Sequence, residues 1–335
     1  MGLALDLQQP VRVGIVGAGL AGQYHYERLG LRGDYRVVAL FDSHEATRHI
    51  CGSLPVWRSS WAEFLDTPDL DVVLIATPPA THLTLALDAL HAGKHLLLET
   101  PACLNLSELD RLAATAEACH ARVCVAVLRR WSEDFRLALQ CIATGELGAL
   151  QTLRRVSWQF SPGPDSVVDP ADWRLRTSSG GGVLWEVGLH EIDQLLQLLP
   201  GLPCRLFARS AGSTDDSPDQ AMLVHLEFPG GATAVLDLHR RALVPRETGW
   251  LITGSTASFG NNILYSLLPD GEIVDVPLVG SPVSPDDFYT EARLYLCNAG
   301  SNPGSLADSR RVLRVIEAIR QSAATGEAVS VADEP

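Results

Sequence analysis

Three glycines near the start of the chain have the spacing of a nucleotide-binding turn. Residues 13–22 read VGIVGAGLAG, so Gly17, Gly19 and Gly22 form a GxGxxG pattern directly after an apolar run. Gly17 permits a tight turn, Gly19 lets the backbone approach a pyrophosphate, and Gly22 allows a helix to pack closely on a strand. The pattern alone is weak evidence, but here it opens a strand–helix–strand unit, which favours a dinucleotide site.

A carboxylate follows the second apolar run. Asp42 lies 20 residues beyond Gly22, where an acidic side chain accepts hydrogen bonds from the adenosine ribose and repels a 2′-phosphate. We therefore expect NAD rather than NADP, with its phosphates on the helix that begins at Leu20 and Ala21. Two alternatives stay open: Asp42 caps the following helix, or Arg48 accommodates a 2′-phosphate.

A second candidate is a carboxylate and an imidazole four residues apart. Glu186 and His190 would share one face of a helix that begins at Gly180–Gly182, where the glycines would let a ligand approach. A histidine with a pKa near 6.5 can accept a hydroxyl proton as hydride leaves the carbon. Glu186 would orient His190 or bind a neighbouring hydroxyl. From the spacing alone, however, a structural histidine–carboxylate pair is the commoner arrangement.

Two loops are candidate borders of the cofactor. The sequence ATPPATH follows the third apolar run, and the carboxyl ends of parallel strands are where ligands bind. The expected cofactor contacts there are Ala76, Thr77, Pro78 and His82. A rigid loop with Thr81 as a helix cap is the alternative. In the other loop, Trp173 and Arg174 precede the glycines, and Arg174 is expected to hold a phosphate or a substrate group unless it forms an exposed salt bridge.

The elements that must position these residues follow two patterns. Apolar runs and helical segments alternate up to residue 127: 11–16, 20–29, 35–41, 45–51, 71–76, 81–92, 94–98, 107–120 and 122–127. This alternation predicts an α/β fold, with an N-terminal Rossmann doubly wound parallel sheet over residues 1–128. Ser107, followed by Asp110, is the expected N-cap of the last helix.

Residues 129–335 have a different pattern. Helices are expected at 132–143, 182–199 and 308–324, and β-strands at 150–160, 205–210, 221–228, 232–238 and 250–254. The pattern predicts a C-terminal α+β domain with a large, mostly antiparallel sheet and helices on one face. Such a domain would bind the substrate.

Composition excludes several classes of protein. The net charge of −14, without a Lys/Arg-rich run, argues against nucleic acid and anionic membranes as partners. The seven cysteines are scattered, and the group Cys119, His120 and Cys124 lacks the second ligand pair of a zinc site, so no metal is expected. With no signal peptide and no apolar run of about 18 residues, a cytoplasmic protein is expected.

Together these residues resemble the Gfo/Idh/MocA oxidoreductase family over nearly the whole chain. Besides GxGxxG and ATPPATH, the resemblance rests on residues 91–101 (HAGKHLLLETP), 129–131 (RRW), 172–174 (DWR), 180–193 (GGGVLWEVGLHEID) and 312–319 (VLRVIEAI). It implies hydride transfer between a nicotinamide and a sugar, inositol or related polyol. It also implies that His190 is catalytic, and that the open sheet face, with Leu223, Val224 and Leu226, is buried in a homodimer or homotetramer.

The chain departs from the family pattern at the candidate catalytic residues. The family usually has Glu-Lys-Pro where this chain has Glu99-Thr100-Pro101, and the family lysine faces nicotinamide and substrate. The resemblance places Glu99 among the expected cofactor contacts. Thr100 offers a hydroxyl donor without charge, and losing one donor to an oxyanion costs about 3 kcal/mol. The aspartate of the family is Glu186 here, and Leu128 replaces a residue that is often polar.

These departures keep three functions open. The first is an NAD-dependent oxidoreductase in which His190 transfers the proton. The second is an NAD-dependent glycosidase or lyase that oxidises its substrate transiently. The third is a non-catalytic NAD-binding regulatory protein.

Overall fold

The computed structural model of the chain describes residues 5–44, 57–160, 173–212, 218–247, 249–280 and 284–331. The chain forms two units: Met1–Val127 with Asp286–Arg310, and Leu128–Pro285 with Arg311–Pro335. All of 129–335 was predicted to form the second domain. The structure instead assigns Asp286–Arg310 to the first unit. None of the helices in these ranges is long and apolar enough to cross a membrane.

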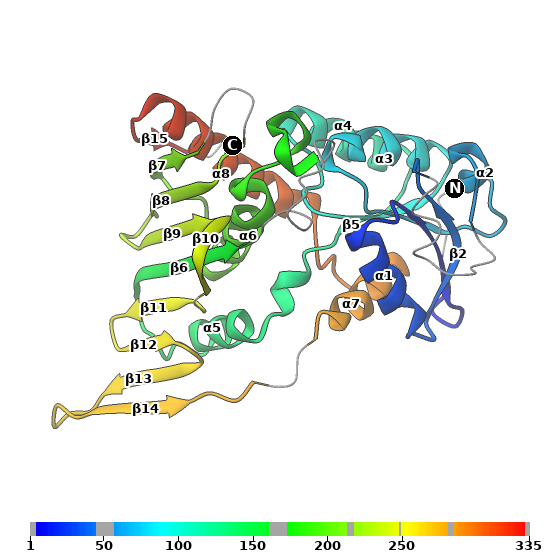
Figure 1. Ribbon diagram of the computed structural model, residues 1–335. Coiled ribbons are helices and arrows are strands. Elements are labelled where there is room, and N and C mark those ends of the chain that lie inside the picture. The colour runs from blue at the N-terminus through cyan, green and yellow to red at the C-terminus, as the bar shows by residue number, and fades with distance from the viewer. Residues whose placement is uncertain are drawn as a thin grey trace. The chain divides into compact units, whose positions relative to one another are not determined.

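The first unit is built on a five-stranded parallel sheet. Its strands are β1 (Val11–Val16), β2 (Tyr35–Phe41), β3 (Val72–Ile75), β4 (His95–Leu98) and β5 (Val123–Val125), in the order β2-β1-β3-β4-β5 (Figure 1). The central strands are buried on both faces, which is why they are almost entirely apolar. Because the strands are parallel, the residues that follow each of them meet at one edge of the sheet.

Helices of the first unit connect these strands. They are α1 (Leu20–Gly30), α2 (Trp61–Leu65), α3 (His82–His91) after the short η2 (Pro79–Thr81), and α4 (Leu106–Ala118). The predicted cap of α4 was wrong: Asn105 accepts the Glu108 N–H at 2.9 Å, while the Glu108 side chain accepts the Leu104 N–H at 3.0 Å. This reciprocal capping leaves Ser107 inside the first turn. The helix predicted at 45–51 lies outside the described residues.

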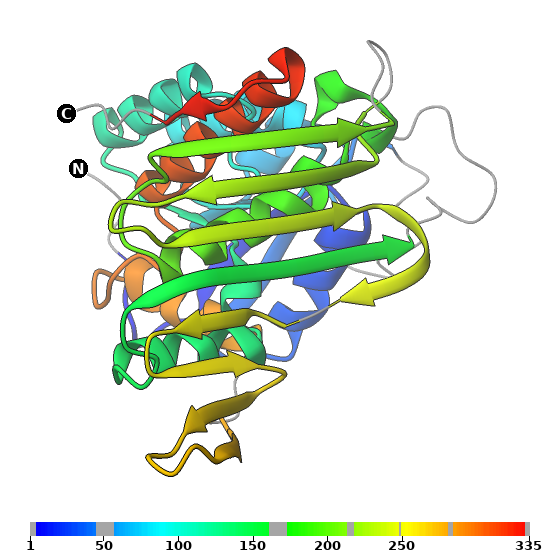
Figure 2. The ribbon, with the colours of Figure 1, turned by 90° about the vertical axis from the view of Figure 1, so that its left-hand side faces the viewer.

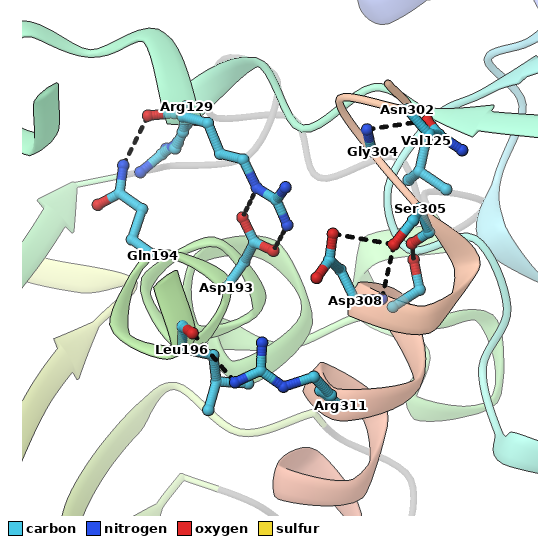
Figure 3. A network of polar contacts seen from close by, with 12 residues as sticks. Val125, Arg129, Asp193, Gln194, Leu196, Asn302, Gly304, Ser305, Asp308 and Arg311 are labelled. Carbon is cyan, nitrogen blue, oxygen red and sulfur yellow. Dashed lines mark hydrogen bonds and ion pairs between the residues drawn. The ribbon is translucent and has the colours of Figure 1, made fainter. Parts of the chain in front are cut away.

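The returning segment is tied to the sheet by specific contacts. It contains α7 (Asp286–Leu296), where the Tyr289 carbonyl accepts the Tyr35 hydroxyl of β2 at 2.8 Å. Further along, the Asn302 amide donates to the Val123 carbonyl of β5 at 2.8 Å, and Asn302 also accepts the Gly304 N–H (Figure 3). A Cβ at Gly304 would lie 1.9 Å from the Val125 carbonyl oxygen, so only glycine allows this close approach.

The second unit is built on a ten-stranded sheet (Figure 2). Its strands are β6 (Leu150–Phe160), β7 (Arg205–Ala211), β8 (Ala221–Glu227), β9 (Thr233–His239), β10 (Arg241–Glu247), β11 (Leu251–Gly254), β12 (Ala257–Gly260), β13 (Ile263–Leu267), β14 (Ile273–Pro277) and β15 (Val329–Ser330). Their order is β14-β13-β12-β11-β6-β9-β8-β7-β15, with β10 also paired to β6. Only the β6–β9 pair is parallel among the described pairs.

Helices cover one face of this sheet. They are η3 (Leu128–Trp131), α5 (Glu133–Ala143), α6 (Leu189–Leu198) and the second part of α8 (Leu306–Thr325), whose Ser322 hydroxyl accepts the Ala208 N–H of β7 at 2.9 Å. None of the described helices crosses the opposite face in Figure 2. Strand β8 alternates accordingly: Val224 and Leu226 are buried, whereas Leu223 is 40% exposed. Placing all three on the open face was therefore wrong, because neighbouring strand residues point to opposite sides.

Candidate active site

The GxGxxG turn leaves open space at one of its three glycines. Gly17 has φ +95°, and a Cβ there would lie 2.5 Å from the Ala76 carbonyl oxygen. A Cβ at Gly22 would lie 1.8 Å from the Gly17 carbonyl oxygen, whereas a Cβ at Gly19 would meet no atom within 4 Å. Gly17 and Gly22 are thus required by the packing of the chain itself. Gly19, beside a helix N-terminus that no side chain caps, leaves room for a phosphate.

Asp42 lies directly after β2 and against this turn. One carboxylate oxygen accepts the Ala18 N–H at 2.7 Å, and the other accepts the His44 N–H at 2.8 Å. The His44 contact is a local turn, and the helix that Asp42 was alternatively expected to cap lies outside the described residues, as does Arg48. The Asp42 carboxylate, at the end of β2, therefore lies against the turn in which Gly19 leaves open space.

The turn after β3 is held by its own side chains. The Thr77 and Thr81 hydroxyls lie 2.7 Å apart, and Thr81 donates to the Pro78 carbonyl at 2.8 Å. Thr81 is the N-cap residue of α3, as the alternative expected, although its side chain accepts no N–H of the helix. Thr77 and Pro78 are partly exposed, as a border of a ligand site requires.

His82 does not face a ligand. It is fully buried, and its two ring nitrogens lie 2.8 Å from the Thr77 carbonyl oxygen and 2.9 Å from the Pro101 carbonyl oxygen. Burial lowers the pKa of His82, while the two carbonyls act in the opposite direction. His82 therefore joins the turn after β3 to the turn after β4, rather than contacting the cofactor as the sequence analysis expected.

Glu99 and Thr100 follow β4 at the same edge. One Glu99 oxygen lies 2.6 Å from the His25 Nε2 atom, and the other accepts the Thr100 N–H at 2.9 Å. The expected cofactor contact Glu99 is thus directed at the protein's own groups, while Thr100 is partly exposed. His25 was not among the expected site residues, because nothing in its spacing links it to Glu99, 74 residues away.

In the second unit, the glycines that precede the Glu186 segment make room for protein atoms. A Cβ at Gly181 would lie 2.3 Å from the Arg174 carbonyl oxygen, and one at Gly182 would lie 2.3 Å from the Asp219 Oδ1 atom. The expectation that Gly181 and Gly182 let a ligand approach was therefore wrong. Asp219 was not expected at all: it accepts the Leu184 N–H at 2.9 Å, and burial raises its pKa.

The Trp173–Arg174 loop packs against these glycines. In the short η4 (Trp173–Leu175), the Arg174 guanidinium lies over the Trp173 ring at 4.6 Å from its centre, and both side chains are partly exposed. The Arg174 carbonyl accepts a hydrogen bond from Arg240 at 3.1 Å. This cation–π pair positions the guanidinium.

Glu186 lies in a π-helical turn. The turn, η6 (Leu184–Gly188), precedes α6, and the Leu189 N–H reaches back to the Leu184 carbonyl, five residues earlier. The helix predicted over 182–199 therefore does not have the regular 3.6 residues per turn at its start. Such π-turns are rare and frequently occur at functional sites.

Glu186 and His190 are the accessible groups of this segment. All residues from 180 to 196 are buried except these two. The other acidic side chains of the segment form buried ion pairs. Glu191 lies 2.8 Å from Arg155, and Asp193 binds Arg130 through both oxygens at 2.7 and 2.5 Å. Figure 3 shows the Asp193 ion pair on α6 and, beside it, the Gln194 amide that donates to the Arg129 carbonyl. Burial thus separates the structural acids from the candidate catalytic pair.

Arg240 is the further site residue that sequence reasoning missed. It is buried at the end of β9, and its guanidinium lies 3.1 Å from the Glu186 Oε1 atom, which also accepts the Gly182 N–H at 3.4 Å. With the Arg174 carbonyl, Arg240 therefore connects the π-turn to the Trp173–Arg174 loop. No spacing signal marks Arg240, since it lies 54 residues beyond Glu186 on another element.

Comparisons with known proteins identify the class. Residues 11–127 match the family model described as "Oxidoreductase family, NAD-binding Rossmann fold", and residues 135–260 match the "GFO/IDH/MocA C-terminal domain". The chain belongs to the Gfo/Idh/MocA oxidoreductase family. It is therefore an oxidoreductase with an NAD-binding Rossmann fold, as the resemblance implied.

Individual relatives are more distant. The chain is 26% identical over 314 residues to the rhizopine catabolism protein MocA of Rhizobium meliloti, covering 92% of this chain and 93% of that protein. It is 26% identical to the myo-inositol 2-dehydrogenase of Thermotoga maritima, covering 76% of each. It is also 26% identical to the scyllo-inositol 2-dehydrogenase (NADP(+)) IolW of Bacillus subtilis, covering 74% of this chain and 68% of that protein.

Solved structures share the fold. An NAD-binding protein from Listeria innocua superposes with a TM-score of 0.84 at 24% identity, covering 96% of this chain and 97% of that one. At this identity the likeness establishes the fold, and the chemistry has to be argued from the site.

Proposed function

We propose that the chain is an NAD-dependent oxidoreductase that transfers a hydride between nicotinamide and a CH–OH carbon of an inositol, a sugar or a related polyol. The observation that carries this proposal is the selective exposure of Glu186 and His190 in a segment where every other residue from 180 to 196 is buried. Relatives named as inositol dehydrogenases support the substrate class.

The cofactor fits the first unit. Gly19 and the uncapped start of α1 would hold the pyrophosphate, and Asp42 would bind the adenosine ribose, for which its acidic charge favours NAD over NADP. Ala76, Thr77 and Pro78 would border the dinucleotide, with Leu20 and Ala21 at the start of the helix. When bound, the nicotinamide supplies the hydride acceptor.

His190 would move the proton. As the substrate carbon is oxidised, its hydroxyl must lose a proton, and an imidazole nitrogen of His190 accepts it. Glu186, the other partly exposed residue of the segment, would orient His190 or bind a neighbouring hydroxyl. Arg240 and the Gly182 N–H hold that carboxylate, so Glu186 acts as a positioning residue and not as a second acid.

Thr100 would be a neutral donor beside the reacting oxygen. Its hydroxyl replaces the charge of the family lysine, which leaves the proton transfer to His190 alone. Trp173 and Arg174 of the second unit would contact the cofactor, with the Arg174 guanidinium as a donor to a phosphate or a substrate group.

The central test compares wild type with His190→Ala on a panel of inositols and sugars. We expect NADH formation in wild type and a decrease of at least about 100-fold in His190→Ala, since positioned general bases contribute about 10²–10⁴ in rate. NADH affinity should change by less than about twofold. His91→Ala, at the exposed end of α3, is the matched control and should keep full activity.

Thr100→Lys extends the same test. If His190 drives hydride transfer, the added lysine should be tolerated and raise single-turnover NADH formation, because it places a positive charge where the alkoxide develops. Full activity in His190→Ala would remove the catalytic assignment. Glycoside cleavage without net NADH would instead identify the glycosidase or lyase, and tight NAD binding with neither reaction would identify a regulatory protein.

A further inference from the structure

Two buried side chains, Tyr289 and His25, form a hydrogen-bonded chain that ends at the partly exposed Glu99. The Tyr289 hydroxyl of α7 lies 2.7 Å from the His25 Nδ1 atom, and the His25 Nε2 atom lies 2.6 Å from a Glu99 oxygen. His25 and Tyr289 are fully buried. All three side chains are satisfied when Tyr289 donates to Nδ1 and His25 donates from Nε2 to Glu99. The chain joins α1, β4 and α7, which are far apart in sequence.

Each end of this chain is fixed. Burial raises the pKa of Tyr289 well above its usual range, so its hydroxyl keeps the proton that it donates. The Tyr289 backbone is held in turn by the Tyr35 hydroxyl of β2 at 2.8 Å. At the other end, the second Glu99 oxygen accepts the Thr100 N–H at 2.9 Å. The orientation of His25 is therefore transmitted to the backbone of residue 100.

The segment Glu99–Pro101 is thus held from two helices. His25 of α1 holds it through the Glu99 side chain, and His82 of α3 holds it through the Pro101 carbonyl at 2.9 Å. His25 lies on the helix whose N-terminus is open at Gly19. One residue therefore couples the helix that would receive the pyrophosphate to the turn that carries Thr100.

We propose that His25 is a positioning residue of the cofactor site, which fixes Glu99 and the Thr100 turn relative to α1 through its Nε2 donor, with Tyr289 orienting its ring. The inference rests on the proposed function, because it assumes that this edge of the sheet receives the dinucleotide. It assigns His25 no contact with cofactor or substrate.

Two substitutions distinguish the role of the His25 Nε2 atom from that of its Nδ1 atom. In His25→Gln the side-chain amide can reach Glu99, as Nε2 does, whereas in His25→Asn the shorter amide can replace only Nδ1. We expect NADH, titrated by its fluorescence, to bind at least about tenfold more weakly to His25→Asn, a loss of 1.4 kcal/mol. His25→Gln should bind within about threefold of wild type. Urea unfolding of each variant measures stability separately.

A merely structural role would give a different pattern. It would lower the stability of both variants while the folded fraction bound NADH as wild type does, or it would leave His25→Gln no better than His25→Asn; either result overturns the inference. If wild type itself fails to bind NADH, the proposed function fails instead. Glu27→Gln, at an exposed position of α1, is the control and should leave the affinity unchanged.

A measurement on wild type decides the case if His25→Asn does not fold. In protein labelled with ¹⁵N-histidine, the His25 ring signals can be assigned by their absence in His25→Gln. Saturating NADH should shift the Nε2 signal, because the cofactor settles against the segment that His25 holds. Unchanged His25 signals at saturation would overturn the inference.

Discussion

Burial divides His25, His82 and His190 into two settings, and it decides the role of each. His25 and His82 are fully buried, and both of their ring nitrogens lie against protein groups. His190 is partly exposed in a segment that is otherwise buried. A proton-transfer residue has to reach its substrate, so only His190 suits that role. The sequence presents all three as the same side chain.

Cofactor choice is a prediction at the residue scale and depends on Asp42. We expect wild type to bind NAD at least about tenfold more tightly than NADP, because the carboxylate would face the 2′-phosphate. Asp42→Ser should narrow this preference. It should also weaken NAD binding, since the Ala18 N–H loses its charged acceptor, worth about 1.5 kcal/mol. Calorimetric titration of both cofactors measures the two effects.

The control for Asp42 is another acidic residue of the same unit. Glu27→Gln removes the same charge from an exposed position on α1 and should leave the NAD/NADP ratio unchanged. Equal or reversed affinities in wild type would contradict the assignment of Asp42.

At the scale of an element, the π-turn at Leu184–Gly188 is a local irregularity of the second unit. It is held from outside: Asp219 binds the Leu184 N–H, and Arg240 binds the Glu186 carboxylate. A π-turn is less regular than an α-helical turn and needs such support. The supporting residues come from the region between 218 and 240, so the geometry of Glu186 depends on tertiary contacts.

Arg240→Met tests this support. Breaking a buried ion pair costs about 3–5 kcal/mol, and we expect about 2 kcal/mol here because the Glu186 side chain is 17% exposed. The turnover should also fall, since Glu186 and the Arg174 loop lose a shared partner. Urea unfolding and kcat measure the two effects.

The neighbouring residue supplies the control. Arg241 is exposed, and Arg241→Met should change the free energy of unfolding by less than about 0.5 kcal/mol. Arg240→Lys keeps the charge and should recover part of the lost stability. Equal effects of Arg240→Met and Arg241→Met would contradict the role assigned to Arg240.

At the scale of the whole molecule, the ten-stranded sheet leaves one face without helices in the described chain. Leu223 lies on that face, beside Arg209 of β7 and Asp237 of β9. A wide sheet face that carries an apolar side chain between a basic and an acidic one is suited to burial against a second copy of itself. We propose a homodimer or homotetramer that uses this face.

Light scattering tests the assembly. We expect a mass of at least twice the 36.1 kDa of one chain at micromolar concentration. Leu223→Glu should shift the population toward the monomer, because it places a charge in the interface. Leu31→Glu, at an 82% exposed position of the first unit, should not. A wild-type monomer would refute the proposal.

Local sequence signals were sufficient for most of the parallel sheet. The predicted strands at 11–16 and 35–41 agree with β1 and β2 residue for residue, because each is a short buried run between turn residues. The sequence also predicted the roles of Gly17 and Gly22. At both positions another backbone group lies so close that no Cβ fits. Signals of this kind depend on neighbours a few residues away.

Other features depended on distant contacts. Strands β12, β13 and β14 and helix α7 were not predicted, because short or weakly patterned segments take their structure from the sheet or unit that they join. The partners of Glu99 and Glu186 were not predicted either. His25 lies 74 residues from Glu99, and Arg240 lies 54 residues from Glu186, so only the fold brings each pair together.

The sequence by itself thus determined the family, the order of the main elements and the identity of the candidate reactive groups. Those properties reside in residue types and short spacings. Tertiary structure alone decided which titratable groups stay accessible: the ion-paired Glu191 and Asp193 are buried, whereas His190 and the Arg240-bound Glu186 stay partly exposed. Burial and charge pairing are set by atoms from separate elements, so no local pattern encodes them.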